Sequence, residues 1–418
     1  MHALEKIIAA HAGKESVKCG EIVNCQVDMA EVNDIYLQVI KSFYEMGGKR
    51  VKNPEGIVFV LDHYAPAPTM QAAANQKVMR EFVWEQGIPH LFDVNCGVCH
   101  QVMPEAGIVW PGMILVASDS HTTTHGAFGA LGTGVGATDL ATIMLSGELW
   151  FRVPEVIKIT VDGGLQPGVM AKDVILHILG QLKQDVAVYK AIEYTGSAID
   201  RLSMAGRMVL CNMAVEMGAK TAYIQPDEKT LAYVRAHTNR PFTVYTTDPD
   251  YKYAAEYHFV VSQLEPQVAA PHSVDNVVNV KQVEGIKVDQ VFIGSCTGGR
   301  LEDIAAAAKI LKGKKIAPHC RLLVLPASTA VLREGIKAGY IDDLLAAGAT
   351  LATPGCGPCL GVHDGVLAAG ETCVSTGSRN FLGRMGSTGA FVYSASPATA
   401  AAAALNGKIV DPRPYIGN

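Results

Sequence analysis

Short apolar runs alternate with segments of helical periodicity along most of the chain. Apolar runs bounded by turn residues predict buried strands, and apolar residues spaced three and four apart predict amphipathic helices. This alternation predicts an α/β fold with mostly parallel sheets covered by helices. The predicted strands are Ile57–Leu61, Met113–Ala117, Val156–Val161, Gln290–Ile293, Arg321–Leu325, Ala349–Ala352 and Thr372–Ser375. The predicted helices include Met70–Glu85, Thr138–Leu149, Ala171–Leu182, Leu301–Leu311 and Ser328–Ala338.

Two changes in composition predict where the chain divides. A Gly-rich region gives way to a new strand near Phe151–Pro154, and Glu265–His272 has the polar, Pro-containing composition of a linker. At roughly 100–200 residues per domain, a chain of 418 residues suits two or three domains, and the two changes in composition favour three α/β units. We expect these units to be residues 1–153, 154–270 and 271–418.

The overall charge excludes several classes of partner. The 35 basic and 40 acidic residues give a formal net charge of −5, which steers no whole surface toward nucleic acid or anionic membrane. A negatively charged protein that binds an anionic substrate must instead rely on particular arginines. The N-terminus lacks the features of a secretory signal, and no run of 18 apolar residues predicts a transmembrane helix. We therefore expect a cytoplasmic protein that does not bind membranes.

Polar, reactive residues follow five of the predicted strands directly. In open parallel sheets, ligands bind beyond the carboxyl ends of the strands. The pattern therefore predicts that these residues meet in one cleft between the units. The segments that follow the five strands are Asp62–His63, Ser118–His121, Gly294–Cys296, Thr353–Cys359 and Thr376–Asn380.

Three of the ten cysteines lie in these segments. Cys356 and Cys359 form a C-x-x-C motif in a loop that Pro358 is expected to keep from being helical, and Cys296 lies in a second, Gly-rich loop. Cysteines in a large chain without a secretory signal more often bind metal or do chemistry than form disulfides. Three thiolates match three irons of a [4Fe–4S] cluster and leave the fourth open as a Lewis acid for a substrate. A zinc knuckle and a redox pair are the alternatives, although structural zinc usually takes four ligands.

Two further motifs have simpler interpretations. Cys96–His100 matches the C-x-x-C-H of covalent haem attachment, but no export signal accompanies it, so Cys96 and Cys99 are interpreted as small buried residues. The Gly-rich run Ala127–Ala137 contains G-x-G-x-x-A, but the preceding strand ends well upstream at Ala117. A dinucleotide site would need the strand to lead directly into the run. We expect close backbone packing there instead.

Four motifs in order along nearly the whole chain together resemble the aconitase superfamily. They are Ala117–Gly126, Gly294–Asp303, Pro354–Gly361 and Ser378–Arg384. Within the superfamily the chain is similar to the large subunits of 3-isopropylmalate dehydratase. It is also similar to those of homoaconitase and 2,3-dimethylmalate dehydratase. The resemblance implies three α/β/α domains around a central cleft that holds one [4Fe–4S] cluster per subunit.

The resemblance also implies a role for each matching residue. Cys296, Cys356 and Cys359 would be the cluster ligands. The remaining matching residues would act on the substrate. Those implied to be catalytic are Asp62, His63, His100, Asp119, His121 and Glu216, and those implied to bind substrate are Ser120, Asn212, Arg379 and Arg384.

The implied activity is that of a hydro-lyase. It would interconvert 2- and 3-isopropylmalate, small hydroxy-dicarboxylic acids of leucine biosynthesis, by dehydration and rehydration. Monomeric aconitases carry a further swivelling domain that supplies the base for the carbon-bound proton. The sequence ends at Asn418 without such a domain, which implies a separate small subunit as partner. The mild charge argues against a cluster-switched RNA-binding protein. An electron-transfer protein would need four cysteines per cluster.

Overall fold

The first main sheet consists of five parallel strands in the order β4-β3-β2-β5-β6. The computed structural model describes residues 1–416. The strands are β2 (Met29–Asn33), β3 (Ile57–Val60), β4 (His90–Phe92), β5 (Ile114–Ala117) and β6 (Leu131–Gly134). The helices of this part are α1 (Ala3–His11), α2 (Gln38–Glu45), α3 (Met70–Gln86), α4 (Cys99–Glu105) and α5 (Ala137–Ser146).

A separate antiparallel pair lies beside this sheet. Strand β1 (Ile22–Gln26) pairs with β7 (Glu148–Arg152). The predicted helix Thr138–Leu149 was wrong at its C-terminal end, where β7 begins. Gly147 ends helix α5 because its φ of +76° is a left-handed conformation that favours glycine.

The second main sheet has four parallel strands in the order β10-β9-β8-β11. The strands are β8 (Val156–Asp162), β9 (Ala191–Thr195), β10 (Thr221–Tyr223) and β11 (Ala255–Val260). The helices are α6 (Ala171–Leu182), α7 (Ser197–Arg201), α8 (Met204–Met213) and α9 (Glu228–His237). Buried side chains from the first two sheets form one continuous hydrophobic core, in which Leu115 of β5 and Ile157 of β8 both take part.

The third main sheet has seven strands in the order β13-β12-β18-β17-β14-β15-β16. The five strands from β18 to β16 are parallel, and β12 and β13 are antiparallel at one edge. Its own core lies beneath helix α10. The strands are β12 (Gln267–Ala269), β13 (Val277–Asn279), β14 (Gln290–Ile293), β15 (Arg321–Val324), β16 (Thr350–Leu351), β17 (Thr372–Ser375) and β18 (Phe391–Ala395). The helices are α10 (Leu301–Leu311), α11 (Thr329–Lys337), α12 (Tyr340–Ala347) and α13 (Pro397–Asn406).

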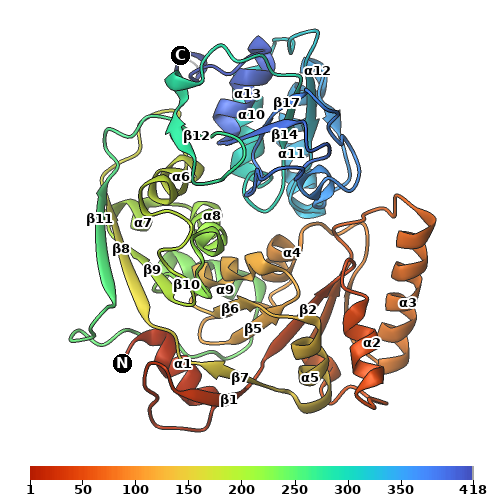
Figure 1. Cartoon of the computed structure of the whole chain (residues 1–418), viewed down its shortest axis with the longest axis vertical. Helices are drawn as coiled ribbons and strands as arrows, with labels where there is room; N and C mark the ends of the chain where they lie inside the picture. Colours follow the sequence, from red (N-terminus) through yellow and green to blue (C-terminus); the bar gives the residue numbers. More distant parts are fainter. Residues whose placement is uncertain (417–418) are drawn as a thin grey trace.

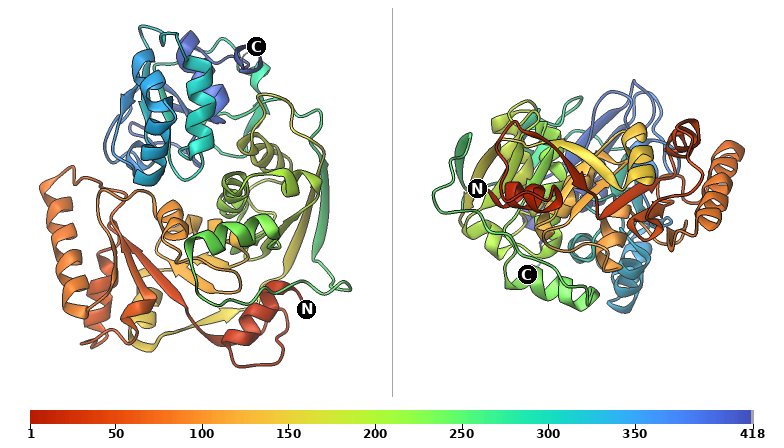
Figure 2. Two further views of the ribbon diagram at one scale, coloured as in Figure 1. Left: turned by 180° about the vertical axis from the view of Figure 1, so that it is seen from behind. Right: turned by 90° about the horizontal axis from the view of Figure 1, so that it is seen from below.

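These findings confirm the α/β class with mostly parallel sheets and correct one detail. The segment Glu265–His272 was predicted to be a linker, but its centre is strand β12, which is buried between β13 and β18. The first two main sheets lie within the first two predicted units, but β12 of the third sheet precedes the predicted boundary after residue 270. The boundaries after residues 153 and 270 stay a prediction. Figure 1 shows the third sheet with α10 and α13 above the other two, and the view from behind shows the same separation (Figure 2).

The Gly-rich run from Ala127 packs closely, as predicted. A Cβ on Gly132 would lie 2.3 Å from the carbonyl oxygen of Thr122, and one on Gly134 would lie 2.8 Å from that of Asp119. Glycine is therefore needed where β6 passes beside the segment that follows β5. Within residues 1–416, the helices are too short or too polar to cross a bilayer.

Candidate active site

Predicted site residues that follow strands of the first and third sheets meet in one small pocket. It lies at the carboxyl ends of β3, β5, β14 and β17, as the strand pattern predicts for parallel sheets. The residues that line it are His63, Val98, His100, Asp119, His121, Ser295, Cys296, Cys356, Cys359, Leu360, Ser378 and Arg384.

Asp62 and His63 follow β3 and form a buried acid–imidazole pair. His63 Nδ1 lies 2.7 Å from Asp62 Oδ1, and Asp62 Oδ2 accepts a hydrogen bond from the backbone N–H of Cys99 at 2.8 Å. Asp34 accepts the backbone N–H groups of His63 and Tyr64 at 3.0 and 2.9 Å and so fixes this loop. Although burial opposes it, the neighbouring Cys356, Asp62 and Asp119 raise the pKa of His63 well above its usual range.

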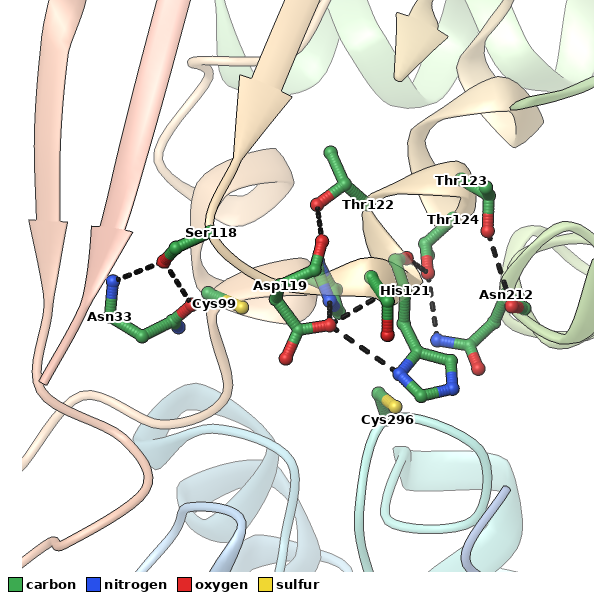
Figure 3. A network of polar contacts seen from close by, with 12 residues as sticks. Asn33, Cys99, Ser118, Asp119, His121, Thr122, Thr123, Thr124, Asn212 and Cys296 are labelled. Atoms are coloured by element: carbon green, nitrogen blue, oxygen red, sulfur yellow. Dashed lines mark hydrogen bonds and ion pairs between the residues drawn. The ribbon is translucent and has the colours of Figure 1, made fainter. Parts of the chain in front are cut away.

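Asp119 is the centre of the next group, at the end of β5 (Figure 3). Its Oδ1 lies 3.1 Å from His100 Nε2 and accepts the backbone N–H of His121 at 2.7 Å. Its Oδ2 lies 3.5 Å from His63 Nε2. Burial would raise the pKa of Asp119, but hydrogen bonds from these three histidines hold it well below its usual range. Asp119 is therefore an anion that orients three imidazoles.

A second carboxylate lies on the other side of His121. Glu216 Oε1 lies 2.7 Å from His121 Nε2 and accepts a hydrogen bond from Arg379 Nε, also at 2.7 Å. Arg379 Nη2 donates to Ser120 Oγ at 3.1 Å. Burial opposes ionisation, yet His121 and Arg379 lower the pKa of Glu216. The predicted residues from all three sheets are thus linked by charged hydrogen bonds.

The three cysteines face this group from the third sheet. Cys296 follows β14, and the backbone N–H of Cys356 donates to the carbonyl oxygen of Asp62 at 2.8 Å. Pro358 was expected to exclude a helix, but Gly357–Leu360 forms one 3₁₀ turn. Proline is tolerated in a first turn because its missing N–H is not needed there. Burial raises the pKa of Cys296 to about 11 and also raises that of Cys356.

Cys359 differs from the other two thiols. Arg384 Nη2 lies 3.9 Å from its sulfur. Burial opposes ionisation of Cys359, but Arg384 and His121 hold its pKa below the usual value. Arg384 also lies over the ring of Phe381, with its guanidinium carbon 5.5 Å from the ring centre.

The donors around the pocket fit an iron–sulfur cluster. Cys296, Cys356 and Cys359 line one pocket, and thiolate is the ligand that such clusters take. Within residues 1–416, several buried polar atoms near the cysteines have no hydrogen-bond partner, as expected where a bound group completes the site. These atoms are Asn212 Oδ1, Arg300 Nη2, Ser378 Oγ and Arg384 Nε.

Asn212 comes from helix α8 and also belongs to this group. Its side-chain amide donates to Thr124 Oγ1 at 2.8 Å (Figure 3), and its oxygen is one of the buried atoms named above. Cys99 is buried as predicted, whereas Cys96 is only half-buried. The segment of Cys96 packs against the loop before α11.

Sequence reasoning did not identify Asp34, Glu31 or Lys172. Lys172 is buried in α6 and donates to the carbonyl oxygen of Gly377 at 2.9 Å. Burial lowers its pKa to about 8, although the thiols of Cys296 and Cys359 oppose the shift. A lysine inside an apolar helix face was the available signal, because a fully buried lysine is rare without polar partners.

The sequence of the chain is similar to those of known proteins. A model of the aconitase family (aconitate hydratase) matches residues 5–407. The chain is 52% identical over 413 residues to "3-isopropylmalate dehydratase large subunit 1" of Methanopyrus kandleri, covering 99% of each chain. It is 47% identical over 418 residues to the 3-isopropylmalate dehydratase large subunit of Moorella thermoacetica, covering 100% of this chain and 99% of that one.

Two further comparisons broaden this picture. A probable methanogen homoaconitase large subunit of Methanosarcina mazei is 53% identical over 388 residues, which cover 93% of this chain and 98% of that one. The crystal structure of aconitase X from Thermococcus kodakaraensis superposes with a TM-score of 0.50 at 13% identity, covering 91% and 90% of the two chains. That likeness concerns the fold alone. From the family model and the full-length relatives, the chain belongs to the aconitase family of hydro-lyases.

Proposed function

We propose that the chain is the large subunit of a 3-isopropylmalate dehydratase that holds one [4Fe–4S] cluster on Cys296, Cys356 and Cys359. The observation that carries the proposal is the convergence of these three thiols with Asp119 and its histidines in one pocket. Its support from the comparisons is the identity of about half over full length to large subunits of that name.

Each group of residues then has a task in dehydration and rehydration. When bound, a cluster iron without a protein ligand supplies Lewis acidity toward a hydroxyl and a carboxylate of the substrate. His63 Nε2 lies 3.5 Å from Asp119 Oδ2 at the pocket, where the imidazole is placed to give a proton to a departing hydroxyl. Asp62 and Asp119 keep the imidazole oriented for this transfer.

The arginines are assigned to the substrate carboxylates. Arg379 is held by Glu216 and Ser120 and its side chain is partly exposed, and Arg384 lines the pocket. A guanidinium binds a carboxylate through two parallel hydrogen bonds, which fixes the substrate as well as neutralising it. Glu216, in the turn after α8, lines a cavity together with Arg379.

We further propose a small subunit as partner, because the relatives are named large subunits and match this chain over nearly their whole length. The partner would supply the base for the carbon-bound proton and part of the substrate-binding surface. Homoaconitase is the alternative within the same reaction class, since a relative of that name is equally similar.

The test is an assay of the chain with each candidate small subunit after anaerobic reconstitution with iron and sulfide. Isopropylmalate, homocitrate and dimethylmalate are supplied in turn, and the unsaturated intermediate is followed by its ultraviolet absorbance. We expect turnover of isopropylmalate. Cys296→Ser should abolish it, while the matched control Cys373→Ser, a buried cysteine of β17 away from the pocket, should keep it. Turnover of homocitrate alone would assign the alternative, and no turnover with any acid would contradict the proposal.

A further inference from the structure

A buried chain of polar side chains connects the cysteine loop of the third sheet with the helix that carries His100. Arg300 follows the loop of Cys296 and is only 2% exposed. Its Nη1 donates to the carbonyl oxygen of Cys296 at 2.6 Å, and its Nε donates to Gln101 Oε1 at 2.9 Å. One guanidinium therefore holds the backbone of a cysteine of the pocket and the residue next to His100.

The chain continues from Gln101 to the third sheet again. Gln101 Nε2 donates to Glu105 Oε1 at 2.7 Å, and the same oxygen accepts the hydroxyl of Ser328 at 2.9 Å. Ser328 is 1% exposed and caps α11 through Val331 N–H. The network thus leaves the third sheet at Arg300, crosses helix α4, and returns at Ser328.

The backbone joins the two parts at the same place. The N–H of Val98 donates to the carbonyl oxygen of Ala327 at 2.8 Å, and the N–H of Thr329 donates to that of Cys96 at 2.9 Å. Gly97 forms an isolated β-bridge with Ser328, and its φ of +127° and the nearby backbone leave no room for a Cβ. This is a fixed junction, so the side-chain network acts on a rigid frame.

A residue that directly precedes a helix, as Arg300 precedes α10, ordinarily caps the helix or pairs with an acid of the first turn, here Glu302 or Asp303. The backbone N–H of Arg300 does donate to Asp303 Oδ2 at 2.9 Å, so Asp303 caps the helix. The guanidinium itself turns the other way, toward Cys296 and Gln101. Capping therefore needs only the backbone, and the buried guanidinium has a separate purpose.

We infer that Arg300 is a positioning residue that sets the Cys296 loop against His100. The inference rests on the proposed function for the role of Cys296 as a cluster ligand. The fork of a guanidinium binds two acceptors at a fixed spacing, which a lysine ammonium does not reproduce. Loss of Arg300 leaves the Cys296 carbonyl and Gln101 without their donor and frees the loop to open.

The experiment compares Arg300→Met, Arg300→Lys and the wild type, with Arg333→Met as matched control because Arg333 is exposed on α11. In the reconstituted full chain, loss of visible cluster absorbance is followed after a chelator is added. A charged hydrogen bond contributes enough that we expect loss about tenfold faster in Arg300→Met, partial rescue in Arg300→Lys, and no change in the control.

A second readout does not need the cluster. In the iron-free full chain, iodoacetamide labelling of Cys296 is measured by peptide mass spectrometry, with buried Cys373 as internal reference. Arg300→Met should raise labelling of Cys296 about tenfold and leave Cys373 unchanged. Gln101→Leu should also raise the labelling of Cys296. In the double variant the increase in labelling should be smaller than the product of the two single increases, because both substitutions break one network.

The outcomes separate this inference from the proposed function. The positioning role is wrong if Cys296 is labelled at the wild-type rate in Arg300→Met. It is also wrong if the labelling of Cys296 and Cys373 increases together, as expected when the whole fold is destabilised. If the wild type takes up no iron while Arg300→Met still exposes Cys296 selectively, the proposed function fails and the positioning of the loop stands.

Discussion

Asp119 shows how a single residue organises the site. It follows a buried strand directly, and its carboxylate lies within hydrogen-bonding distance of His100 and His121 and 3.5 Å from His63 Nε2. The residue type and its place after β5 were predictable from the sequence, because polar residues at the carboxyl ends of parallel strands gather at one edge. His121 lies in the same segment, but the contacts with His63 and His100 were not predictable without the resemblance, since these two come from other parts of the chain.

Asp119→Asn tests this arrangement. Asparagine turns an amide toward a histidine that needs an acceptor, so the imidazoles lose both their orientation and their counter-charge. We expect turnover with the partner subunit to fall by about 10²–10⁴-fold, the range of acid–base catalysis, with the fold retained. Steady-state kinetics with Asp342→Asn, an exposed residue of α12, as control checks this. Activity within about threefold of the wild type would show that Asp119 has no such role.

Glu31 presents the opposite electrostatic case. It is fully buried in β2, and within residues 1–416 neither carboxyl oxygen has a hydrogen-bond partner. Burial, together with Asp62 and Asp119, raises its pKa well above the usual range. The sequence did not identify it, because an acid between Ala30 and Val32 suggests an exposed strand face, whereas both faces of β2 are covered.

Glu31→Gln predicts a change in how stability depends on pH. The folded pKa is raised, so the stability that the acid contributes is fully present below its unfolded pKa of about 4.3 and is lost as pH rises toward the folded value. Glutamine cannot ionise, so this loss is absent from the variant. The free energy of unfolding of the variant, relative to that of the wild type, should therefore rise between pH 5 and pH 9. Urea unfolding at both pH values, with exposed Glu45→Gln as control, measures the difference. Equal pH profiles would mean that Glu31 is not a buried neutral acid.

Among the elements, those with the clearest periodicity were predicted best. The observed bounds of α6, α10, β14 and β17 agree with the predicted ones, because each combines a strong apolar pattern with turn residues at its ends. The sequence missed β2, β9 and β18, although each has five residues and lies inside its sheet, and it missed shorter strands such as β12 as well. β12 lies in a Pro-containing segment that is polar in composition, and its burial is set by β18, which is distant in sequence.

The 3₁₀ helix Ser120–Phe128, which presents His121, depends on a close approach at its end. Gly126 lies against β10, and a Cβ there would be 2.1 Å from the carbonyl oxygen of Ala222. Gly126→Ala must displace this backbone, and we expect it to cost about 1–3 kcal/mol or more of unfolding free energy. Gly136→Ala, from the Gly-rich run that follows, is the control, since the nearest neighbour of a Cβ there lies 3.7 Å away at Asp139. Equal urea unfolding curves for the two variants would contradict this packing.

The three main sheets of the molecule do not correspond to three separate hydrophobic cores. The first two sheets share one hydrophobic core, whereas most of the third sheet packs on its own. The sequence predicted three units from composition, but shared burial between segments far apart in sequence leaves no local pattern. This explains why residues of the pocket could be predicted from the sequence, whereas the contacts between them could not.

Amide hydrogen exchange tests this division. Leu210→Ala in α8 removes a buried side chain of the shared core and should cost about 2–5 kcal/mol. Exchange should then increase in both β5 and β8. Ile304→Ala in α10 should increase exchange in β14 and β17 and leave β8 unchanged. If Leu210→Ala affects only one of the first two sheets, the shared core does not act as one cooperative unit.

The central claim is that three cysteine thiolates hold a cluster with one iron left for the substrate. Mössbauer spectroscopy of the full chain, reconstituted anaerobically with ⁵⁷Fe, measures this most directly. The account predicts four irons per chain, one of which changes its signal when isopropylmalate is added, and loss of the cluster in Cys356→Ser. Four irons that all ignore the substrate, or zinc bound by Cys296, Cys356 and Cys359 in place of iron, would contradict it.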